Sequence, residues 1–224
     1  FTDNQGGDNY AQGGSRVTVQ NGAAESTVSQ VGRYLAANGG KANPDTLYTV
    51  WTGANDLFAV AAGAPPQETL ATAVGGVVQI VGTLDAAGAR YILVPSLPDM
   101  GITPNAIAAG PVAQATLTQL ATTYNTSMYG ALAQAGYRVI PLDTFSMLRE
   151  VVASPGTYGM RNVTQTACLP PSGSSLTCNP SSLVAPDAAT TYLFADGVHP
   201  SGGAHAILAD YAISVLEGPQ LIGI

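Results

Sequence analysis

The residues best suited to chemistry are an aspartate and a histidine in the segment Asp196-Gly-Val-His199-Pro200. An aspartate three residues before a histidine can accept a hydrogen bond from the imidazole Nδ1–H, which fixes the tautomer and leaves Nε2 free as a base. Pro200 restricts His199 to an extended backbone and so holds it outside the helix that follows. A surface histidine beside a helix-capping aspartate would have the same spacing. The second histidine, His205, is expected to be an ordinary helix side chain.

Two further segments could supply hydrogen-bond donors to a reacting oxygen. Trp51-Thr-Gly53-Ala-Asn55-Asp56 directly follows a predicted strand, and a primary amide there can donate to a developing oxyanion without changing its charge. Its glycine allows a sharp turn. In Asn9-Tyr-Ala-Gln-Gly-Gly-Ser-Arg16, adjacent glycines can expose a backbone N–H. Taken singly, the first segment could be an ordinary turn and the second a flexible loop.

The chain around these segments predicts alternating strands and helices. Short apolar runs predict buried strands at 47–51, 90–94 and 137–140, the last two stopped by prolines. Apolar spacing and end signals predict helices at 24–37, 67–88, 111–136, 143–152 and 203–216. This order indicates an α/β fold with a parallel sheet and helices on both faces. Ligands in such folds bind at the carboxyl ends of the strands, where the Gly53–Asp56 segment is expected.

Length and composition predict one globular domain over residues 1–224, with an irregular insertion at 154–192. Apolar residues make up 46% of the chain and charged residues 9%, the opposite of a disordered composition. Cys168 and Cys178 lie in a loop rich in Pro, Ser and Gly, which predicts a disulfide in an oxidising compartment; two reduced thiols are the alternative. No metal is expected, because two cysteines and two distant histidines match no zinc spacing.

Charge and hydropathy exclude several classes of protein. The net charge is −7, Lys41 is the single lysine and the arginines are scattered, so a nucleic-acid binder is excluded. Attraction to anionic membranes is not expected for the same reason. No run of about 18 to 20 apolar residues is present. The polar start Phe1-Thr-Asp-Asn has no basic leader, so a mature or trimmed chain is expected.

Three motifs together resemble a known family. The N-Y-A-x-G-G block at 9–14, the G-x-N-D block at 53–56 and the D-x-x-H-P block at 196–200 resemble the second, third and fifth blocks of the GDSL lipase/esterase (SGNH hydrolase) family. The resemblance extends over nearly the whole chain. It implies a flavodoxin-like three-layer α/β/α sandwich with a parallel sheet. The last helix, from His205, resembles that of autotransporter-type members, which implies secretion or display at the bacterial surface.

The resemblance implies a role for each matching residue. His199 would be the general base, oriented by Asp196, while Gly13 and Asn55 would donate hydrogen bonds to the oxyanion; Asp56 would be structural. The family's first block, G-D-S-x-S, carries the nucleophilic serine, and it does not occur in residues 1–224. The first strand and the nucleophile are therefore expected on a companion N-terminal fragment. Ser15 and Ser96 are poor substitutes, because neither is predicted to sit in a sharp strand-to-helix turn.

The predicted function is a serine esterase or lipase that hydrolyses carboxylic esters through an acyl-enzyme intermediate, without cofactor. The same residues would serve a carbohydrate O-acetyl esterase or a phospholipase/acyltransferase. A hypothesis of another class is a non-catalytic surface domain that binds a ligand or a host partner, and the missing nucleophile favours it.

Overall fold

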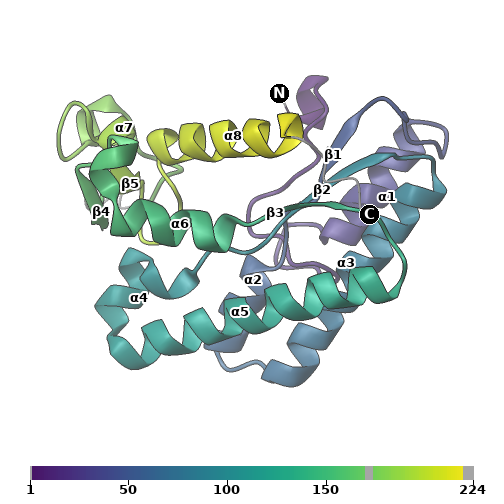
Figure 1. The fold of residues 1–224 in the computed structure, drawn as a ribbon, viewed down its shortest axis with the longest axis horizontal. Coiled ribbons are helices and arrows are strands. Elements are labelled where there is room, and N and C mark those ends of the chain that lie inside the picture. Colours follow the sequence, from purple (N-terminus) through teal and green to yellow (C-terminus); the bar gives the residue numbers. More distant parts are fainter. Residues whose placement is uncertain (1, 170–173, 219–224) are drawn as a thin grey trace. The chain divides into compact units, whose positions relative to one another are not determined.

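The structure is a computed structural model that describes residues 2–169 and 174–218 (Figure 1). Its contacts divide the chain into two compact units. The first comprises residues 1–97 and 120–141, and the second comprises 98–119 and 142–224. Helix α5 (Pro111–Gln134) contributes residues to both. The single domain expected over residues 1–224 stays a prediction.

The first unit is built on a three-stranded sheet in the order β1-β2-β3. Strands β1 (Leu47–Thr49) and β2 (Tyr91–Pro95) run parallel, with Leu47 opposite Tyr91, and β3 (Ile140–Leu142) lies beside β2. The helices of this unit are η1 (Asp3–Gln5), α1 (Thr27–Ala37), α2 (Ala54–Ala61) and α3 (Pro66–Ala86).

Helix α3 is the central helix of the first unit, and both α1 and α2 pack against it. Pro66 stands at its first position, where the missing N–H costs no hydrogen bond. Its buried face includes Val77, Ile80, Val81 and Leu84. By length and apolar composition alone α3 could cross a membrane, and core helices of globular proteins have the same properties.

The second unit is built around two parallel strands, β4 (Asn162–Thr166) and β5 (Tyr192–Phe194). Figure 1 shows α6 and α8 beside these strands. Its core cluster consists of Leu148, Val151, Met160, Leu193, Phe194 and Ala204. The other elements are η2 (Met100–Ile102), α4 (Pro104–Ala109), α6 (Thr144–Ala153), η3 (Pro155–Tyr158), η4 (Pro180–Ser182), α7 (Ala188–Thr191) and α8 (Gly202–Glu217).

The α/β class with parallel strands is confirmed, and the five predicted helices are present. Several details differ, and helix α2 and strand β5 were not predicted. The segment 154–192 is not wholly irregular, because it contains β4, whose polar sequence has no apolar alternation to indicate a strand. Neither of the last two predicted strands stops before its proline: β2 has Pro95 as its last residue, and β3 includes Pro141, which an edge strand tolerates. The first strand is not buried throughout, since Leu47 is 40% exposed.

Candidate active site

Asp196 and His199 form a close pair in the loop between β5 and α8. Imidazole Nδ1 lies 2.9 Å from Asp196 Oδ1 and 2.8 Å from Oδ2, as the D-x-x-H spacing predicts. The carboxylate therefore holds the proton on Nδ1 and leaves Nε2 as the basic nitrogen. The Asp196 side chain is buried, whereas that of His199 is 62% exposed. The pair thus presents a fixed imidazole to the solvent side.

Asp196 is a buried carboxylate that accepts hydrogen bonds from several protein N–H groups. Burial acts to raise its pKa, but the backbone N–H groups of Val198, Ser175 and His199 and the His199 ring outweigh burial and hold the pKa below its usual range. Oδ1 accepts from Val198 N at 3.0 Å and from His199 N at 2.8 Å, and Oδ2 accepts from Ser175 N at 2.7 Å. Asp196 is therefore a carboxylate at neutral pH, as its role beside a base requires.

The turn that carries this pair is closed by its own backbone. Ala195 N donates to His199 O at 2.8 Å, so the chain returns on itself within five residues. In α4, Asn105 N donates to Gly197 O at 3.0 Å, and a Cβ at Gly197 would overlap the Asn105 side chain. The glycine inside the D-G-V-H segment is therefore required by packing. Ser201 then caps α8, because its hydroxyl accepts from Ala204 N.

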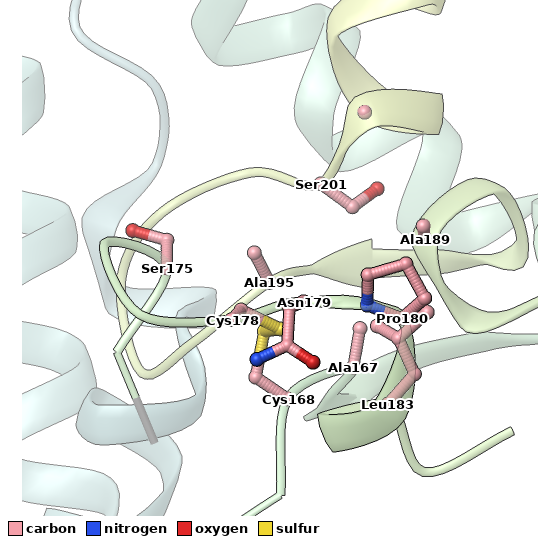
Figure 2. A pocket seen from close by; sticks show the side chains of 11 residues that line it. Ala167, Cys168, Ser175, Cys178, Asn179, Pro180, Leu183, Ala189, Ala195 and Ser201 are labelled. Atoms are coloured by element: carbon pink, nitrogen blue, oxygen red, sulfur yellow. A yellow bond between two sulfur atoms is a disulfide. The ribbon is translucent and has the colours of Figure 1, made fainter. Parts of the chain in front are cut away.

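The disulfide loop lies against the same turn. Cys168 and Cys178 are joined, so the predicted disulfide is present in the structure, with 5.8 Å between the Cα atoms. Figure 2 shows this disulfide and Ser175 around a pocket of about 260 Å³ that also contacts Ala195 and Ser201. The pocket lies in the second unit. Ala195 precedes the Asp196–His199 turn and Ser201 follows it, so the pocket beside the disulfide is lined by residues on both sides of this turn.

The amide of Asn55 is anchored at the start of α2 in the first unit. Nδ2 donates to Ser15 O at 2.9 Å. Because a primary amide carries two N–H groups, this bond fixes the side chain and leaves the second donor available. Asn55 is thus held in place by Ser15, which lies in the second motif two residues after Gly13.

Gly13 lies in a tight turn between Gln12 and Ser15. Ser15 N donates to Gln12 O at 3.3 Å, and Gly14 has a φ of +85°, which the third position of a type II turn requires. A Cβ on Gly13 would meet nothing within 4 Å, so the backbone there is open. Within residues 2–169 and 174–218, no hydrogen bond from the Gly13 N–H is present, and its role as an oxyanion donor stays a prediction.

Asp56 joins the second and third motifs and is structural in its geometry. Its carboxylate accepts from Arg16 Nε and from Val17 N, each at 3.0 Å, and it is 1% exposed. Burial raises the pKa of Asp56, although Val17 N–H and Arg16 act in the opposite direction. Together, Asn55 and Asp56 fasten the glycine turn to the first turn of α2.

Gly53 sets where α2 begins. It is the N-cap, with a φ of +117°, and Tyr124 of α5 packs directly on its Cα while donating from its hydroxyl to Thr52 O at 2.9 Å. Burial raises the pKa of Tyr124 above its usual range, so the phenol remains a donor. A side chain at position 53 would overlap the Tyr124 ring. Because only a glycine fits beside the Tyr124 ring, Gly53 lets α2 begin at this point, and this start places Asn55 in the first turn of the helix.

Gly53→Ala is expected to destabilise the protein by about 3 kcal/mol, from backbone strain and overlap with the Tyr124 ring. Gly63→Ala is the matched control, because Gly63 follows the same helix with a φ of +106° but has open space around its Cα. It should cost about 1 kcal/mol. Urea unfolding of both variants measures the difference. Equal losses would show that the ring contact contributes nothing.

Neither serine weighed as a substitute nucleophile has suitable surroundings. Ser15 Oγ donates to Gln12 O at 2.8 Å and accepts from Gln30 Nε2 at 2.7 Å. Ser96 is 2% exposed, and its carbonyl accepts from Trp51 Nε1. A hydroxyl that is already engaged or buried has no open line to a substrate carbonyl.

The predicted site residues are thus grouped by unit. Asp196 and His199 are in contact in the second, and Asn55 is bonded beside Gly13 in the first. His205 is an exposed residue of α8, as expected. Within the described residues, no group of three or more His, Cys, Asp or Glu side chains could hold a metal.

Sequence reasoning missed the groups that support the predicted ones. The Ser175 N–H and the Ser15 carbonyl are backbone atoms, so residue type gives no signal for them. Asn105 and Tyr124 act at contacts distant in sequence. The two motif glycines, Gly53 and Gly197, are the signal that could have indicated a close neighbour.

Comparison with known proteins agrees with these motifs. The chain matches the GDSL-like lipase/acylhydrolase family over residues 2–212. It is 35% identical to esterase EstA of Pseudomonas aeruginosa, over 95% of this chain and 35% of that protein. It is 26% identical to lipase 1 of Photorhabdus luminescens, over 97% of this chain and 43% of that protein. A GDSL esterase/lipase of Arabidopsis thaliana, APG, is 32% identical over 62% of this chain and 42% of its own length.

The chain spans less than half the length of these curated relatives. The family match, by contrast, extends over nearly all of the chain and includes all three motifs. On this ground the chain belongs to the GDSL-like lipase/acylhydrolase family.

Proposed function

We propose that this chain provides the general base and the oxyanion donors of a serine esterase that hydrolyses carboxylic esters. The observation that carries the proposal is the contact of both Asp196 oxygens with His199 Nδ1, at 2.9 and 2.8 Å, beside an exposed imidazole. A carboxylate in this position holds the tautomer in which Nε2 can accept a proton. The names of the related esterases and lipases support the same reaction class.

The reaction proceeds through an acyl-enzyme. Nε2 of His199 takes the proton of a serine hydroxyl as its oxygen attacks the ester carbonyl, and Gly13 N–H and Asn55 Nδ2 stabilise the resulting oxyanion. The imidazolium, stabilised by Asp196, then gives that proton to the departing alkoxide, which leaves as an alcohol. Water, deprotonated by the same nitrogen, then attacks the acyl-serine; the bond to the serine oxygen breaks, the imidazolium returns its proton to that oxygen, and the acid is released.

The nucleophilic serine of this mechanism is assigned to a segment outside residues 1–224. The engaged hydroxyl of Ser15 and the burial of Ser96 support this assignment. So does the family resemblance, which places the serine ahead of the Asn9–Gly14 block. We propose that a companion N-terminal segment supplies it, together with a further oxyanion N–H.

Labelling with a fluorophosphonate, followed by denaturing mass analysis, tests the function. The protein carrying the companion segment should take up one adduct, on a serine outside residues 1–224. An adduct on residues 1–224 would overturn the assignment of the nucleophile. If the protein neither took up the label nor hydrolysed esters, the proposal of an esterase would be overturned, and the hypothesis of a non-catalytic binding domain would be supported.

Asn55→Ala is expected to lower kcat by about 10²- to 10³-fold, because one oxyanion donor contributes roughly 3 kcal/mol in the transition state. Asn43→Ala, on an exposed loop of the same unit, is the control and should stay near the parent activity. Steady-state hydrolysis of a soluble ester measures both. Unchanged turnover in Asn55→Ala would remove this amide from the mechanism.

The disulfide supports an extracellular or cell-surface location, because such bonds persist in oxidising compartments. The proposed substrate is a small-molecule or lipid ester. Small acyl esters, sugar acetates and phospholipids would all use the same groups.

A further inference from the structure

The disulfide loop contributes one hydrogen bond to the proposed base–acid pair. Ser175 N donates to Asp196 Oδ2 at 2.7 Å across 21 residues of sequence. The other backbone donors to this carboxylate, Val198 N and His199 N, belong to its own turn. Ser175 is therefore the backbone donor that reaches Asp196 from another segment, and it meets the oxygen whose distance to Nδ1 is 2.8 Å.

The loop is held at both ends beside the Asp196 turn. Cys168 N donates to Ala195 O at 3.0 Å and Ala167 N donates to Phe194 O at 2.9 Å, which extends the pairing of β4 with β5. The disulfide then ties Cys178 to this edge, three residues after Ser175. A cross-link of this kind removes conformational freedom from the closed loop.

Side-chain packing does little to hold the loop at Ser175. The neighbouring Leu176 is 92% exposed, and Ser175 lines a pocket of about 260 Å³ together with Ala195 and Ser201 (Figure 2). A backbone N–H in a segment with little side-chain packing keeps its direction only if the chain on either side is restrained. The disulfide and the pairing of Cys168 supply that restraint.

We propose that residues 174–178, tied to Cys168 by the disulfide, are a positioning element for the base, in which the disulfide holds Ser175 N–H on Asp196 so that the carboxylate stays directed at His199. This inference rests on the proposed function for its catalytic consequence, but the contact itself is independent of activity. Ser175 is a positioning residue that acts through its main chain and does not touch the substrate.

Amide hydrogen exchange tests the contact without any assay of catalysis. In the full-length protein, the Ser175 N–H should be protected, and both Asp196→Ala and the double change Cys168→Ser with Cys178→Ser should speed its exchange by at least about tenfold. Exchange that is unaffected by Asp196→Ala would overturn the contact. Exchange that is affected by Asp196→Ala but not by loss of the disulfide would overturn the role of the cross-link.

Proline at position 175 tests the catalytic consequence, because it removes the N–H. Ser175→Pro is compared with Ser175→Ala, which retains the N–H and removes only the hydroxyl. The kcat of the proline variant should be about tenfold lower than that of the alanine variant, with KM within about twofold, as for other supporting hydrogen bonds.

The same pair of variants is then measured in the Asp196→Asn background. There the ratio of the two kcat values should fall to about one, because the carboxylate that Ser175 positions is gone. A tenfold ratio in both backgrounds would overturn the proposal and assign the effect to general disruption of the loop. If Ser175→Pro does not fold, the double cysteine variant replaces it, with the same coupling to Asp196→Asn expected.

These experiments separate this inference from the proposed function. A parent protein that neither hydrolyses esters nor takes up fluorophosphonate would overturn the function and the catalytic consequence. Protection of Ser175 that depends on Asp196 and on the disulfide would then still support the structural contact.

Discussion

His199→Ala is expected to lower kcat for ester hydrolysis by about 10⁴- to 10⁶-fold, the range seen when the base of a serine hydrolase is removed. Without Nε2, no group takes the serine proton during attack or returns it to the leaving alcohol. The fold should survive, because the side chain is 62% exposed and its partner Asp196 retains its backbone donors. Initial rates with a soluble chromogenic ester, on protein that carries the companion segment, measure the loss.

His205→Ala is the matched control, because His205 is the second histidine of the chain and lies exposed on α8. It should stay within about twofold of the parent rate. Equal losses in the two variants would contradict the assignment of the base. Fluorophosphonate uptake should follow the same order, since formation of the adduct also requires an activated serine.

Asp196→Asn is the second large effect, with an expected loss in kcat of about 10⁴-fold. The native side chain presents two accepting oxygens, whereas an amide presents one acceptor and one donor. Either Nδ1–H of His199 or the neighbouring backbone N–H groups would then face an N–H. The imidazole would adopt the other tautomer or rotate, so Nε2 would no longer be held as the base.

Asp187→Asn is the control for loss of a carboxylate in the same unit. Asp187 pairs with Arg161 at 2.6 Å, and both side chains are about half exposed, so the pair contributes little to stability. This variant should retain the parent kcat within about twofold. A comparable loss in both variants would mean that the effect of position 196 is one of charge alone.

The pH dependence of stability provides a further test of Asp196. Its folded pKa lies below the usual range, so the carboxylate contributes stability that is fully present above the unfolded pKa of about 3.9. That contribution is lost as the pH falls through the folded pKa. The difference in free energy of unfolding between the parent and Asp196→Asn should therefore be constant from about pH 5 to 7 and shrink below about pH 4.

Urea titrations at each pH measure this difference, and titratable groups that do not contact Asp196 cancel between the two proteins. A difference that grew on acidification would contradict the lowered pKa. A difference that did not change down to about pH 2 would mean that the backbone donors do not select the ionised form.

The sequence alone was enough to predict the candidate site residues, because they lie in short motifs whose spacing and family resemblance are both local properties of the chain. The three-residue interval from Asp196 to His199 is short enough for one turn to close, and the turn in the structure has that form. The starts of the helices could also be predicted from local sequence. Pro66 begins α3, and Asp143 caps α6 by accepting a hydrogen bond from Ser146 N. The cysteine spacing predicted the disulfide for the same reason.

The tertiary structure decided what holds these residues in place. The anchors of Asn55 and Asp196 are the Ser15 carbonyl and the Ser175 N–H, at separations of 40 and 21 residues. Every residue type carries such atoms, so no pattern of side chains marks them. Strand β4 was missed for a related reason, because its polar residues are in a strand through pairing with β5 and not through their own hydrophobicity. Local spacing therefore predicted the candidate groups, and long-range backbone contacts hold these groups in the structure.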